Sequence, residues 1–578
     1  MSKFKLVYVS ILGAIIIGCS TTNQDSVVAQ PSITTPDSSN ILDASKYSKA
    51  NAMDHVVVVV MENRSLDNLL GRLYTPEEKP NFDGVIGKNL SNPIPKWAQY
   101  GAEKKVVPYH IATDMDSPNP DTGEWYAHTN TQLYNIMNQQ NKFAYDDKIV
   151  APWNAPKSSS QKPTMNGFVT DYISAFTAEM GRQPTYDEYA QVMSGYTPEQ
   201  VPVISTIARG FGVFDHWYSE VPSQTFTNRS FWVSAQSSGF VKNSPSSNFI
   251  MKNNGETIFN RLDAHGKTWK IYVSEPGYFS LQALINAPKL RDKFKTNVVP
   301  FSQFEKDAAN GTLPDFSFIE PNMTVGHNDY HPAAGRMLIQ GRSIPVDPPS
   351  SILGGELLMA KIYNAVKNSS SATGSNYLNT TLLIGFDEPG GTYDHVAPPM
   401  VVAPESGAPK GQFGFDFQRS GYRVPAILVS AWVPNELVVN EEYRHTSLIA
   451  TLRKKWNLGA PFTNRDATAR TFDNLFTLDK PRLSNTWPSV TPRPVPGYDF
   501  EKNAFGLSVS GLGKAMIDGT IEFAHKDGYK LPCESQIDKN GNMSEITGYN
   551  CIGQASAIIF PQLAESQTIV DMAKYNQK

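Results

Sequence analysis

The stretch "TLLIGFDEPGGTYDHVAPP", residues 381–399, places an apolar run directly before charged side chains. Thr381–Phe386 is typical of a buried strand. The adjacent carboxylates Asp387 and Glu388 follow it, and two glycines then precede an Asp-His pair. Carboxylates at the end of a buried strand are costly unless they are paired, solvated or bound to a cation. Another part of the chain must therefore compensate these two acids.

Other apolar runs indicate the fold class. His55–Met61 is a nearly continuous valine run, which is typical of a strand buried on both faces in a parallel sheet. Helical patterns at residues 355–366 and 445–456 lie between such runs. Strands that alternate with helices favour an α/β fold with a mostly parallel sheet covered on both faces. The remaining predicted strands are Trp269–Val273, Phe316–Ile319 and Ala426–Ala431.

Length and composition narrow the class of protein. The chain has 578 residues, of which 40% are hydrophobic and 11% aromatic, so a large core can form. Its formal charge of -4 argues against a nucleic-acid-binding protein, which normally has a basic face. The 41 prolines and 40 glycines predict many ordered loops.

The N-terminus resembles an export signal. Lys3 and Lys5 precede the apolar run Leu6–Gly18, which is shorter than the roughly 20 apolar residues of a transmembrane helix. Cys19 follows, as in bacterial lipoprotein signals, where cleavage exposes this cysteine for lipidation. We expect an exported, membrane-anchored lipoprotein, periplasmic or at the cell surface. The alternative is an ordinary secretory cleavage site with an incidental cysteine.

The chain divides into four predicted parts. These are a signal peptide (1–18), a Ser/Thr/Asn/Asp-rich disordered tether (19–51), a catalytic domain (52–478) and a C-terminal appendage (479–578). Cys533 and Cys551 remain after export, and they form either one disulfide or two free thiols.

Polar residues follow several of the predicted strands. Glu62 and Asn63 come after the first, and Asp387 and Glu388 after that of the opening stretch. The carboxyl ends of parallel strands meet at one edge of a sheet, so these side chains are expected to converge. Their hard oxygen atoms suit Mg²⁺, Ca²⁺ or Mn²⁺. Each residue taken alone also has a structural interpretation, such as a helix cap for Glu62.

Histidines and glycines extend this candidate site. A histidine can supply positive charge or a transferable proton. Gly390 and Gly391 allow a tight turn and the close approach of a ligand. We expect His445 to begin a helix, because Thr and Ser follow it. The histidines that are candidates for the site are His128, His331 and His395.

Four motifs together resemble a known family. They are "MENRSLDNLLG" (61–71), "VPSQTFTNRSF" (221–231), "NDYHP" (328–332) and "DEPGGTYDHV" (387–396). In this order they resemble the phosphoesterase family of bacterial phospholipases C, non-specific phospholipases C and related acid phosphatases. The resemblance spans roughly residues 53–475. It implies an alkaline-phosphatase-like three-layer α/β core around a mostly parallel sheet.

The resemblance also implies roles for single residues. Thr225 matches the family nucleophile and a further metal ligand, with Ser223 as the competing candidate. His331 and His395 match family histidines, and His128 matches a phosphate-facing one. The residues that match metal ligands are Glu62, Asn63, Asp387 and Glu388.

We therefore expect a metal-dependent phosphoric ester hydrolase of the phospholipase C type, with a covalent phospho-threonine and either His331 or His395 as proton donor. The substrate is a phospholipid or a small phosphate ester. An acid phosphatase and a non-catalytic surface lipoprotein are the alternatives, and the sequence does not set the oligomeric state. Some neighbours of the motifs depart from the family and leave the substrate open: Leu66, Asn68, Thr227 and Pro389.

Overall fold

The computed structural model describes residues 42–144, 148–158, 160–274, 279–323, 327–332, 336–339, 342–345, 351–495, 511–539, 543 and 545–566. Contacts divide the chain into Met1–Asn40 and Ile41–Lys578, and every described residue belongs to the second part. The predicted signal peptide, Cys19 and the tether up to residue 41 lie outside the described residues. Within the described residues, no helix has both the length and the apolar character that a membrane span requires.

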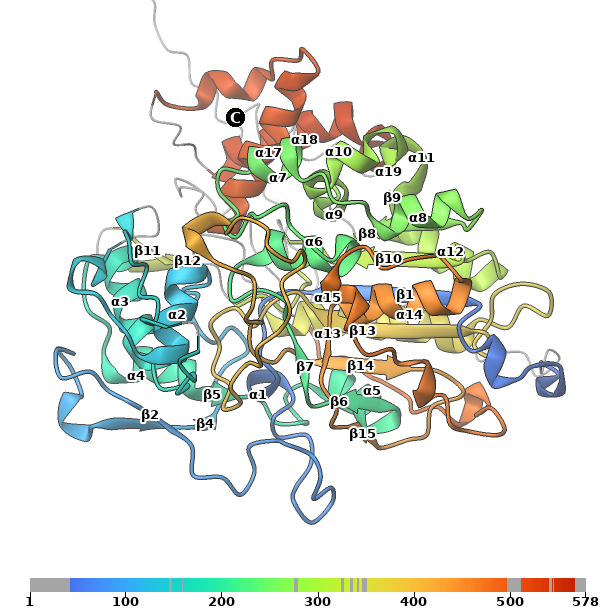
Figure 1. Cartoon of the computed structure of the whole chain (residues 1–578), viewed down its shortest axis with the longest axis horizontal. Helices are drawn as coiled ribbons and strands as arrows, with labels where there is room; N and C mark the ends of the chain where they lie inside the picture. Colours follow the sequence, from blue (N-terminus) through green and yellow to red (C-terminus); the bar gives the residue numbers. More distant parts are fainter. Residues whose placement is uncertain are drawn as a thin grey trace, which may run out of the picture. The chain divides into compact units, whose positions relative to one another are not determined.

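An eight-stranded sheet forms the centre of the second part (Figure 1). Its strands run in the order β15-β6-β14-β13-β1-β10-β8-β9. Only β14 is antiparallel to its neighbours, so the predicted α/β class with a mostly parallel sheet is confirmed. The strands are β1 (His55–Met61), β6 (Gly212–Phe214), β8 (Trp269–Val273), β9 (Val298–Pro300), β10 (Phe316–Glu320), β13 (Thr380–Phe386), β14 (Ala426–Val429) and β15 (Leu437–Val439).

The valine run forms the middle of this sheet. β1 lies between β10 and β13 and is parallel to both, and Val58 pairs with Phe318 on one side and Leu383 on the other. Residues 56–61 are fully buried, as expected for a strand whose two faces are both covered. Met61 pairs with Phe386, so the chain leaves β1 and β13 at the same level.

Helices cover both faces of the sheet. Gly385 faces α6 (Thr225–Ser234), because a Cβ on this glycine would lie 2.7 Å from the ring of Trp232. The next residue, Phe386, points to the opposite face and packs against Tyr330, with ring centroids 5.5 Å apart. That face also carries α13 (Ile352–Asn368) and α5 (Pro202–Gly210), which contact each other and the sheet. On the first face, α14 (Thr446–Trp456) packs against α6.

A buried carboxylate joins the helices of the second face. Glu356 of α13 accepts hydrogen bonds from the backbone N–H groups of Val203 (2.6 Å) and Ile204 (3.0 Å), in the first turn of α5. The hydroxyl of Tyr330 donates to the same carboxylate at 2.6 Å. Burial raises the pKa of Glu356 to about 7. A carboxylate at a helix N-terminus satisfies N–H groups that have no partner within the helix.

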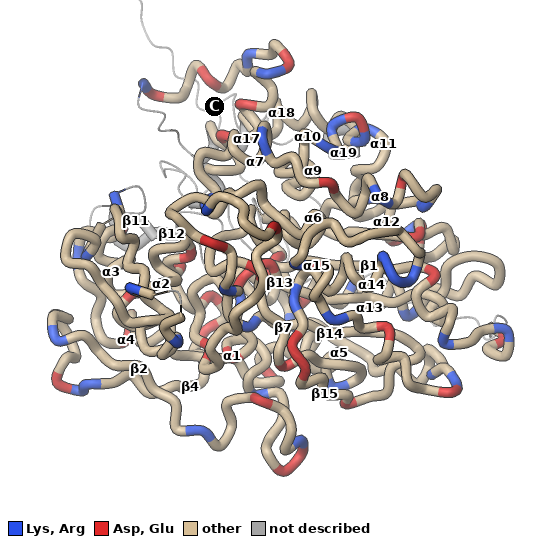
Figure 2. Tube along the Cα trace, in the orientation of Figure 1, with Lys and Arg blue, Asp and Glu red and all other residues tan. Residues whose placement is uncertain are grey.

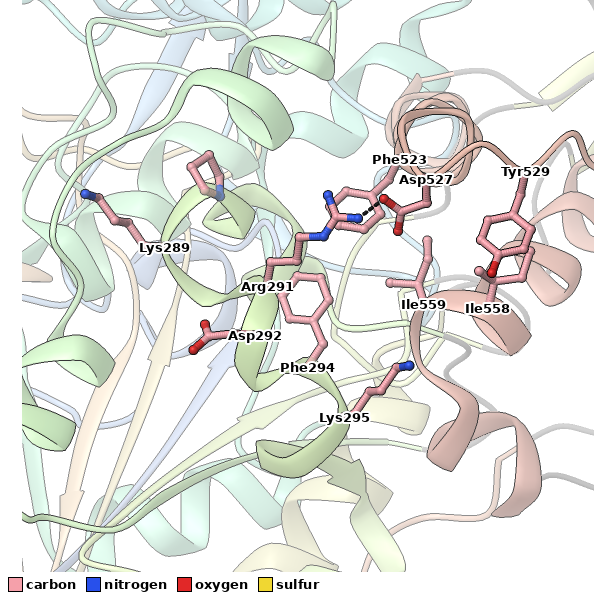
Figure 3. A pocket seen from close by; sticks show the side chains of 11 residues that line it. Lys289, Arg291, Asp292, Phe294, Lys295, Phe523, Asp527, Tyr529, Ile558 and Ile559 are labelled. Atoms are coloured by element: carbon pink, nitrogen blue, oxygen red, sulfur yellow. Dashed lines mark ion pairs between the residues drawn. The ribbon is translucent and has the colours of Figure 1, made fainter.

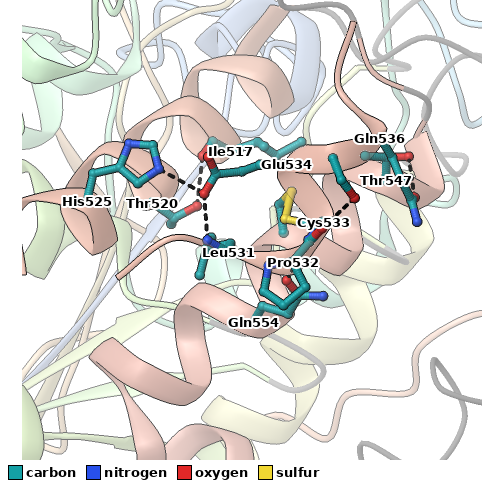
Figure 4. The surroundings of a disulfide bond; sticks show 12 residues. Ile517, Thr520, His525, Leu531, Pro532, Cys533, Glu534, Gln536, Thr547 and Gln554 are labelled. Atoms are coloured by element: carbon teal, nitrogen blue, oxygen red, sulfur yellow. Dashed lines mark hydrogen bonds and ion pairs between the residues drawn. A yellow bond between two sulfur atoms is a disulfide. The ribbon is translucent and has the colours of Figure 1, made fainter. Parts of the chain in front are cut away.

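Both ends of the described chain pack on this core. Residues 42–51 contain two 3₁₀ turns, and Leu42 belongs to the main hydrophobic cluster. The C-terminal helices α17 (Gly511–Lys526), α18 (Glu545–Ile559) and α19 (Pro561–Ser566) contribute to the same cluster. Cys533 and Cys551 form a disulfide among these helices (Figure 4).

A cavity of about 620 Å³ lies between these C-terminal helices and residues 288–295 (Figure 3). Apolar side chains such as Phe294 and Phe523 line it together with charged ones such as Lys295. Arg291 crosses the face of Phe523, 4.8 Å from the ring centroid, and pairs with Asp527. This ion pair connects the C-terminal helices to the segment before β9.

Candidate active site

The ends of β1 and β13 bring three carboxylates together. Glu62 follows β1, and Asp387 and Glu388 follow β13 at the paired position. The backbone N–H of Asp387 donates to the carbonyl of Met61 at 2.9 Å, which continues the strand pairing by one residue. All three carboxylates are almost completely buried. The parallel register therefore accounts for the convergence that the sequence predicts.

Asn63 reaches this cluster through an unusual backbone conformation. Its φ is +53°, in the left-handed region that non-glycine residues seldom occupy. Its backbone N–H donates to Asp387 Oδ1 at 3.1 Å. Its side-chain Nδ2 donates to Glu124 Oε1 and lies 2.9 Å from His331 Nε2. Strained backbone of this kind concentrates at functional sites, where surrounding contacts hold it.

The two glycines give space to Asn63. Gly390 has a φ of +58°, and a Cβ there would lie 2.4 Å from the Cβ of Asn63. Gly391 has a φ of +68°, and its Cβ would lie 2.6 Å from the carbonyl oxygen of Gly123. The sequence predicts the close approach of a ligand at these glycines. In the structure it is the chain itself, at Asn63 and Gly123, that approaches closely.

Thr225 faces the carboxylates from the other side. It is the first residue of α6, it is fully buried, and its Oγ1 donates to Glu62 Oε2 at 3.3 Å. The competing candidate, Ser223, instead donates its hydroxyl to the carbonyl of Val241 at 2.7 Å. The geometry therefore favours Thr225 as the hydroxyl that belongs to the cluster.

The motif after Thr225 shapes the approach to it. Asn228 accepts hydrogen bonds from the N–H groups of Glu220 and Val221 at 3.0 and 2.9 Å. Its amide group donates to the carbonyls of Val221 and Ser223 at 3.1 and 2.8 Å. One side chain thus organises the turn that delivers Thr225 to the start of the helix.

Arg229 is the buried cation of the cluster. Its Nε donates to Glu62 Oε1 at 2.8 Å and lies 3.8 Å from Asp387 Oδ2. Its Nη2 donates to the carbonyl of Val60 at 2.9 Å. Removing one partner of such a buried pair typically costs about 3–5 kcal/mol, because the other charge stays buried alone. In the sequence Arg229 stands out only as part of a motif, so its contact with Glu62 is a further feature that the structure reveals.

The cluster has more buried acid than this arginine can balance. Burial and the neighbouring Asp387 raise the pKa of Glu62 well above its usual range, and burial raises that of Asp387 to about 6. Burial and nearby carboxylates likewise raise the pKa of Glu388 strongly. Figure 2 shows acidic segments gathering between the labels α1, α2 and β13. Such a group is destabilising unless protons or a further cation compensate it.

Unpaired oxygen atoms show where a cation fits. Asn63 Oδ1, Asp387 Oδ2 and Glu388 Oε1 are buried and have no hydrogen-bond partner within the described structure. Buried polar atoms are rarely left in this state, and carboxylate and amide oxygens are the ligands that hard divalent cations prefer. The predicted ligand residues therefore fit a divalent cation, and the structure supplies an independent reason for it.

Two acidic residues outside the predicted set complete one side of the cluster. Asp121, Glu124 and His331 have potential metal-ligand atoms within 4.8 Å of one another. Glu124 Oε1 accepts from Asn63 Nδ2 and lies 3.3 Å from His331 Nε2. Both acids lie in a loop without regular periodicity, so the sequence offers no signal for them apart from their nearness to His128.

The predicted histidines lie in three different environments. His331 is next to Asn63, its Nδ1 donates to the carbonyl of Pro332 at 2.6 Å, and its Nε2 faces the cluster. Burial works against charge on His331, but Asp121 and Glu124 raise its pKa well above the usual value. His128, on α2 (Tyr126–Tyr134), pairs with Asp171 at 2.8 Å.

His395 belongs to a separate ion-pair network. Its Nδ1 lies 2.7 Å from Asp67 Oδ2, and its Nε2 lies 3.2 Å from Asp83 Oδ1. Arg423 joins the network through ion pairs with Asp67 (2.8 Å) and Asp394 (2.9 Å). These bonds connect the segments after β1 and β13. Nearness in sequence to Asp387 therefore does not bring His395 into hydrogen-bond contact with the cluster.

His445 precedes α14 and fixes the backbone at Asp387. Its Nε2 donates to the carbonyl of Asp387 at 2.6 Å, and its Nδ1 accepts from Trp217 Nε1 at 3.1 Å. Burial lowers its pKa to about 4, so the ring is neutral at physiological pH. This placement agrees with the structural role expected from the sequence.

Comparison with known proteins identifies the family. Residues 53–459, most of the chain, match the Phosphoesterase family. The chain belongs to the phosphoesterase family. It is 31% identical over 463 residues to non-specific phospholipase C6 of Arabidopsis thaliana, covering 76% of this chain and 75% of that protein. It is 22% identical over 505 residues to phospholipase C B of Mycobacterium tuberculosis, covering 77% of this chain and 83% of that protein.

Among solved structures, a Vibrio parahaemolyticus protein of the alkaline phosphatase superfamily matches this phosphoesterase with a TM-score of 0.27 and 13% identity, covering 47% of this chain and 64% of that chain. Murine ectonucleotide pyrophosphatase/phosphodiesterase 5 matches with a TM-score of 0.26 and 12% identity, covering 47% and 95%. The sequence relatives and the family match confirm the predicted class of enzyme, a hydrolase of phosphate esters.

The His395 network predicts a pH-dependent stability of this phosphoesterase. Burial and the nearby cations Lys88 and Arg423 work against charge on His395, but Asp67 and Asp83 outweigh them and raise its pKa to about 9. Because the pKa of His395 is higher in the folded state than its value of about 6.5 in the unfolded chain, protonated His395 stabilises the fold. This contribution is complete below about pH 6.5 and is lost as the pH rises towards 9. From pH 6.5 to 9.5, the free energy of unfolding should fall by up to about 3 kcal/mol more in the wild type than in His395→Gln.

Chemical denaturation of the two proteins at a series of pH values measures this difference. The matched control is His265→Gln, since His265 is exposed at the end of α8 (Ile258–Ala264). This variant should follow the wild-type pH profile. If the free energy of unfolding depends on pH in the same way for the wild type and His395→Gln, His395 does not carry the proposed positive charge in the folded protein.

Proposed function

We propose that this phosphoesterase is a metal-dependent phospholipase C that acts through a covalent phospho-threonine at Thr225. One observation carries the proposal. Thr225 Oγ1 is hydrogen bonded to Glu62 at the start of α6, and unpaired oxygen atoms of Asn63, Asp387 and Glu388 lie in the same buried cluster. A neutral hydroxyl is a weak nucleophile, and a neighbouring base or a bound metal ion activates it.

Five residues would hold the cation: Glu62, Asn63, Thr225, Asp387 and Glu388. Their oxygen donors favour Ca²⁺, Mg²⁺ or Mn²⁺ over softer metals. When bound, a divalent cation at this site supplies positive charge for the phosphoryl oxygens and lowers the pKa of a coordinated hydroxyl.

The bond-making and bond-breaking steps of the proposed reaction involve side chains of the cluster. Glu62 Oε2 accepts the Thr225 hydrogen bond, which keeps the hydroxyl proton on the side of Glu62. In the proposed reaction, Oγ1 forms a bond to phosphorus as the bond to the glycerol oxygen breaks, and that oxygen takes up a proton. Water then cleaves the phospho-threonine and releases the phosphorylated headgroup. Diacylglycerol and the free Thr225 hydroxyl are the other products.

His331 is the best-supported proton donor for the glycerol oxygen. Its Nδ1 is bound to the carbonyl of Pro332, so Nε2 is the nitrogen that faces Asn63 and Glu124. His395 has its hydrogen-bond partners in the Arg423 network instead. His128 is held by Asp171, and its matching position in the family supports a role facing the phosphate.

The choice of a phospholipid rests on the named relatives, and a cavity elsewhere on the same domain offers space for a larger substrate. The curated relatives from Arabidopsis thaliana and Mycobacterium tuberculosis are phospholipases C by name. A cavity of about 510 Å³, lined by residues 236–240 and 409–412, lies beside the segment that carries Val241. This cavity is large enough to hold a part of the substrate that lies away from the reacting phosphate.

Thr225→Ala tests the nucleophile. This variant should lose at least about 10³-fold in turnover, because among the described residues no other hydroxyl forms a hydrogen bond with Glu62, Asp387 or Glu388. Ser223→Ala is the matched control, two residues away on the same turn, and should keep activity within about threefold, since the Ser223 hydroxyl bonds the carbonyl of Val241 and not the carboxylates. Activity is measured with metal supplied, and circular dichroism checks the fold of each variant.

The substrate panel compares release of phosphocholine from phosphatidylcholine with hydrolysis of a soluble aryl phosphate. The proposal predicts diacylglycerol and phosphocholine as products and a higher kcat/KM for the lipid. Preference for the aryl phosphate would instead make the protein an acid phosphatase. No hydrolysis of either substrate, with the fold intact and metal present, would leave the non-catalytic alternative. Near-normal activity of Thr225→Ala would refute the nucleophile.

We also propose that lipidated Cys19 anchors the exported enzyme in a bacterial membrane, on the strength of the signal that precedes it. Fractionation of bacteria that express the full chain tests this. The wild type should sediment with membranes, and Cys19→Ala should move to the soluble exported fraction. Equal membrane association of both proteins would contradict the anchor.

A further inference from the structure

Several buried hydrogen-bond donors have no partner within the described structure, among them Arg229 Nη1 in the cluster itself and two donors in segments next to it. Asn243 Nδ2 and Trp125 Nε1 are unpaired within the described structure, although their residues are only 3% and 2% exposed. Leaving such a donor unsatisfied costs about 1–3 kcal/mol, so each one needs an explanation. A ligand that brings acceptor atoms is one explanation, and the position of both donors supports it.

Asn243 is bonded to both residues that flank Thr225. Its Oδ1 accepts from the backbone N–H of Phe226 at 2.9 Å, and its own backbone N–H donates to Gln224 Oε1 at 3.1 Å. Phe226 lies in the first turn of α6, where backbone N–H groups lack partners within the helix. Since the oxygen of the amide is used there, its nitrogen is left as a donor beside the nucleophile.

Trp125 is connected to the cluster through its neighbour in the chain. It follows Glu124, which accepts from Asn63. The ammonium of Lys242 lies 4.4 Å from the Trp125 ring centroid, and Lys242 precedes Asn243 in the chain. The segment 242–243 therefore spans from the Glu124 side of the cluster to the start of α6.

Lys242 adds an uncompensated charge next to Trp125. It is partly buried, and among the described residues it forms no ion pair with a carboxylate. Its backbone N–H donates to Gln412 Oε1 at 3.0 Å, which fixes the backbone from which the side chain projects. The Trp125 face then holds the ammonium by a cation–π contact.

Apart from Arg229 Nη1, which is a donor beside the carboxylates, the unpaired atoms named here are of two chemical kinds. The oxygen atoms of Asn63, Asp387 and Glu388 are acceptors and suit a cation. Asn243 Nδ2 and Trp125 Nε1, with the ammonium of Lys242, are donors and suit an anion. A phosphate ester is the ligand class that needs both kinds of partner at once, because its oxygens carry negative charge and accept hydrogen bonds.

We propose that Lys242, Asn243 and Trp125 form the anion-binding wall of the site and hold the phosphoryl oxygens of the substrate. Asn243 Nδ2 donates to an oxygen on the phosphorus that Thr225 attacks, and Lys242 balances the charge of the same group. This inference rests on the proposed function, since it assigns the residues that bind the reacting phosphate. The phosphate comes either from a lipid phosphodiester or from a soluble phosphate.

Binding of inorganic phosphate to the full-length protein, with divalent metal supplied, tests the wall without turnover. Isothermal titration calorimetry should show binding weakened by about 10- to 100-fold in Asn243→Asp, which keeps the oxygen that caps α6 but replaces the donor with an acceptor. Lys242→Met, which keeps the stem over Trp125, should weaken binding about tenfold and reduce its dependence on salt. Trp125→Phe, which removes the N–H together with the five-membered ring that carries it, should weaken binding about three- to tenfold.

Lys252→Met is the matched control, because Lys252 is exposed at the end of α7 (Ser247–Lys252), ten residues further along the chain. It should leave the phosphate affinity unchanged. A second series uses phosphatidylcholine vesicles and the Thr225→Ala protein, and measures co-sedimentation. A parallel loss in both series indicates that the wall binds the lipid phosphodiester, and a loss for inorganic phosphate alone restricts it to soluble phosphate. Thermal unfolding of each variant confirms that the fold is kept.

The outcomes separate this inference from the proposed function. If the wild type binds phosphate and Asn243→Asp and Lys242→Met bind it equally well, the wall is refuted even when the enzyme is active. If the wild type hydrolyses no phosphate ester but its phosphate binding depends on Asn243 and Lys242, the proposed function fails and the anion site stands. Absence of phosphate binding in the wild type with metal present would refute the site itself.

Discussion

The structure depends on one electrostatic constraint, the burial of Glu62, Asp387 and Glu388 beside the buried Arg229. Parallel pairing of β1 and β13 places the acids together, and Arg229 reaches them from α6. Arg229 satisfies one oxygen of Glu62 directly and leaves oxygens of Asp387 and Glu388 without partners. Carboxylates in a low-dielectric interior repel one another strongly, so bound protons or a further cation must compensate this arrangement.

The surrounding chain stabilises the same geometry from several sides. His445 fixes the carbonyl of Asp387, and the turns at Gly390 and Gly391 allow Asn63 to enter the cluster. Asn228 shapes the turn before Thr225. These contacts are mostly backbone hydrogen bonds and close packing, which position groups within a fraction of an ångström. Phosphoryl transfer depends on such positioning, because the protein contributes mainly orientation and electrostatic stabilisation.

The sequence predicts the centre of the sheet and much of the candidate site. β1 and β8 have the predicted bounds, because short segments rich in valine, isoleucine and aromatic residues are strong strand signals. Glu62, Asn63, Asp387 and Glu388 are predicted since strand ends share one edge of a parallel sheet. The antiparallel direction of β14 is not predictable in this way, because an apolar strand carries no information about its direction.

The contacts of the loop residues in the site cannot be predicted from strand and helix patterns in the sequence. Glu124 and Asn63 are 61 positions apart in the sequence, and no periodic pattern predicts the hydrogen bond between them. Asn243 and Trp125 become conspicuous only as buried donors without partners, which is a property of the fold alone. His395, which the sequence motif suggests for the site, has its hydrogen-bond partners in the Arg423 network, and a catalytic role for it stays a prediction.

The metal content of the purified protein tests the central claim most directly. After dialysis against metal-free buffer, elemental analysis should find about one tightly bound divalent ion per wild-type chain. Asp387→Asn, which removes one charge but keeps the shape of the side chain, should lose most of it. A wild-type protein that is folded and fully active without any divalent ion would contradict the account, because the buried acids would then need no cation.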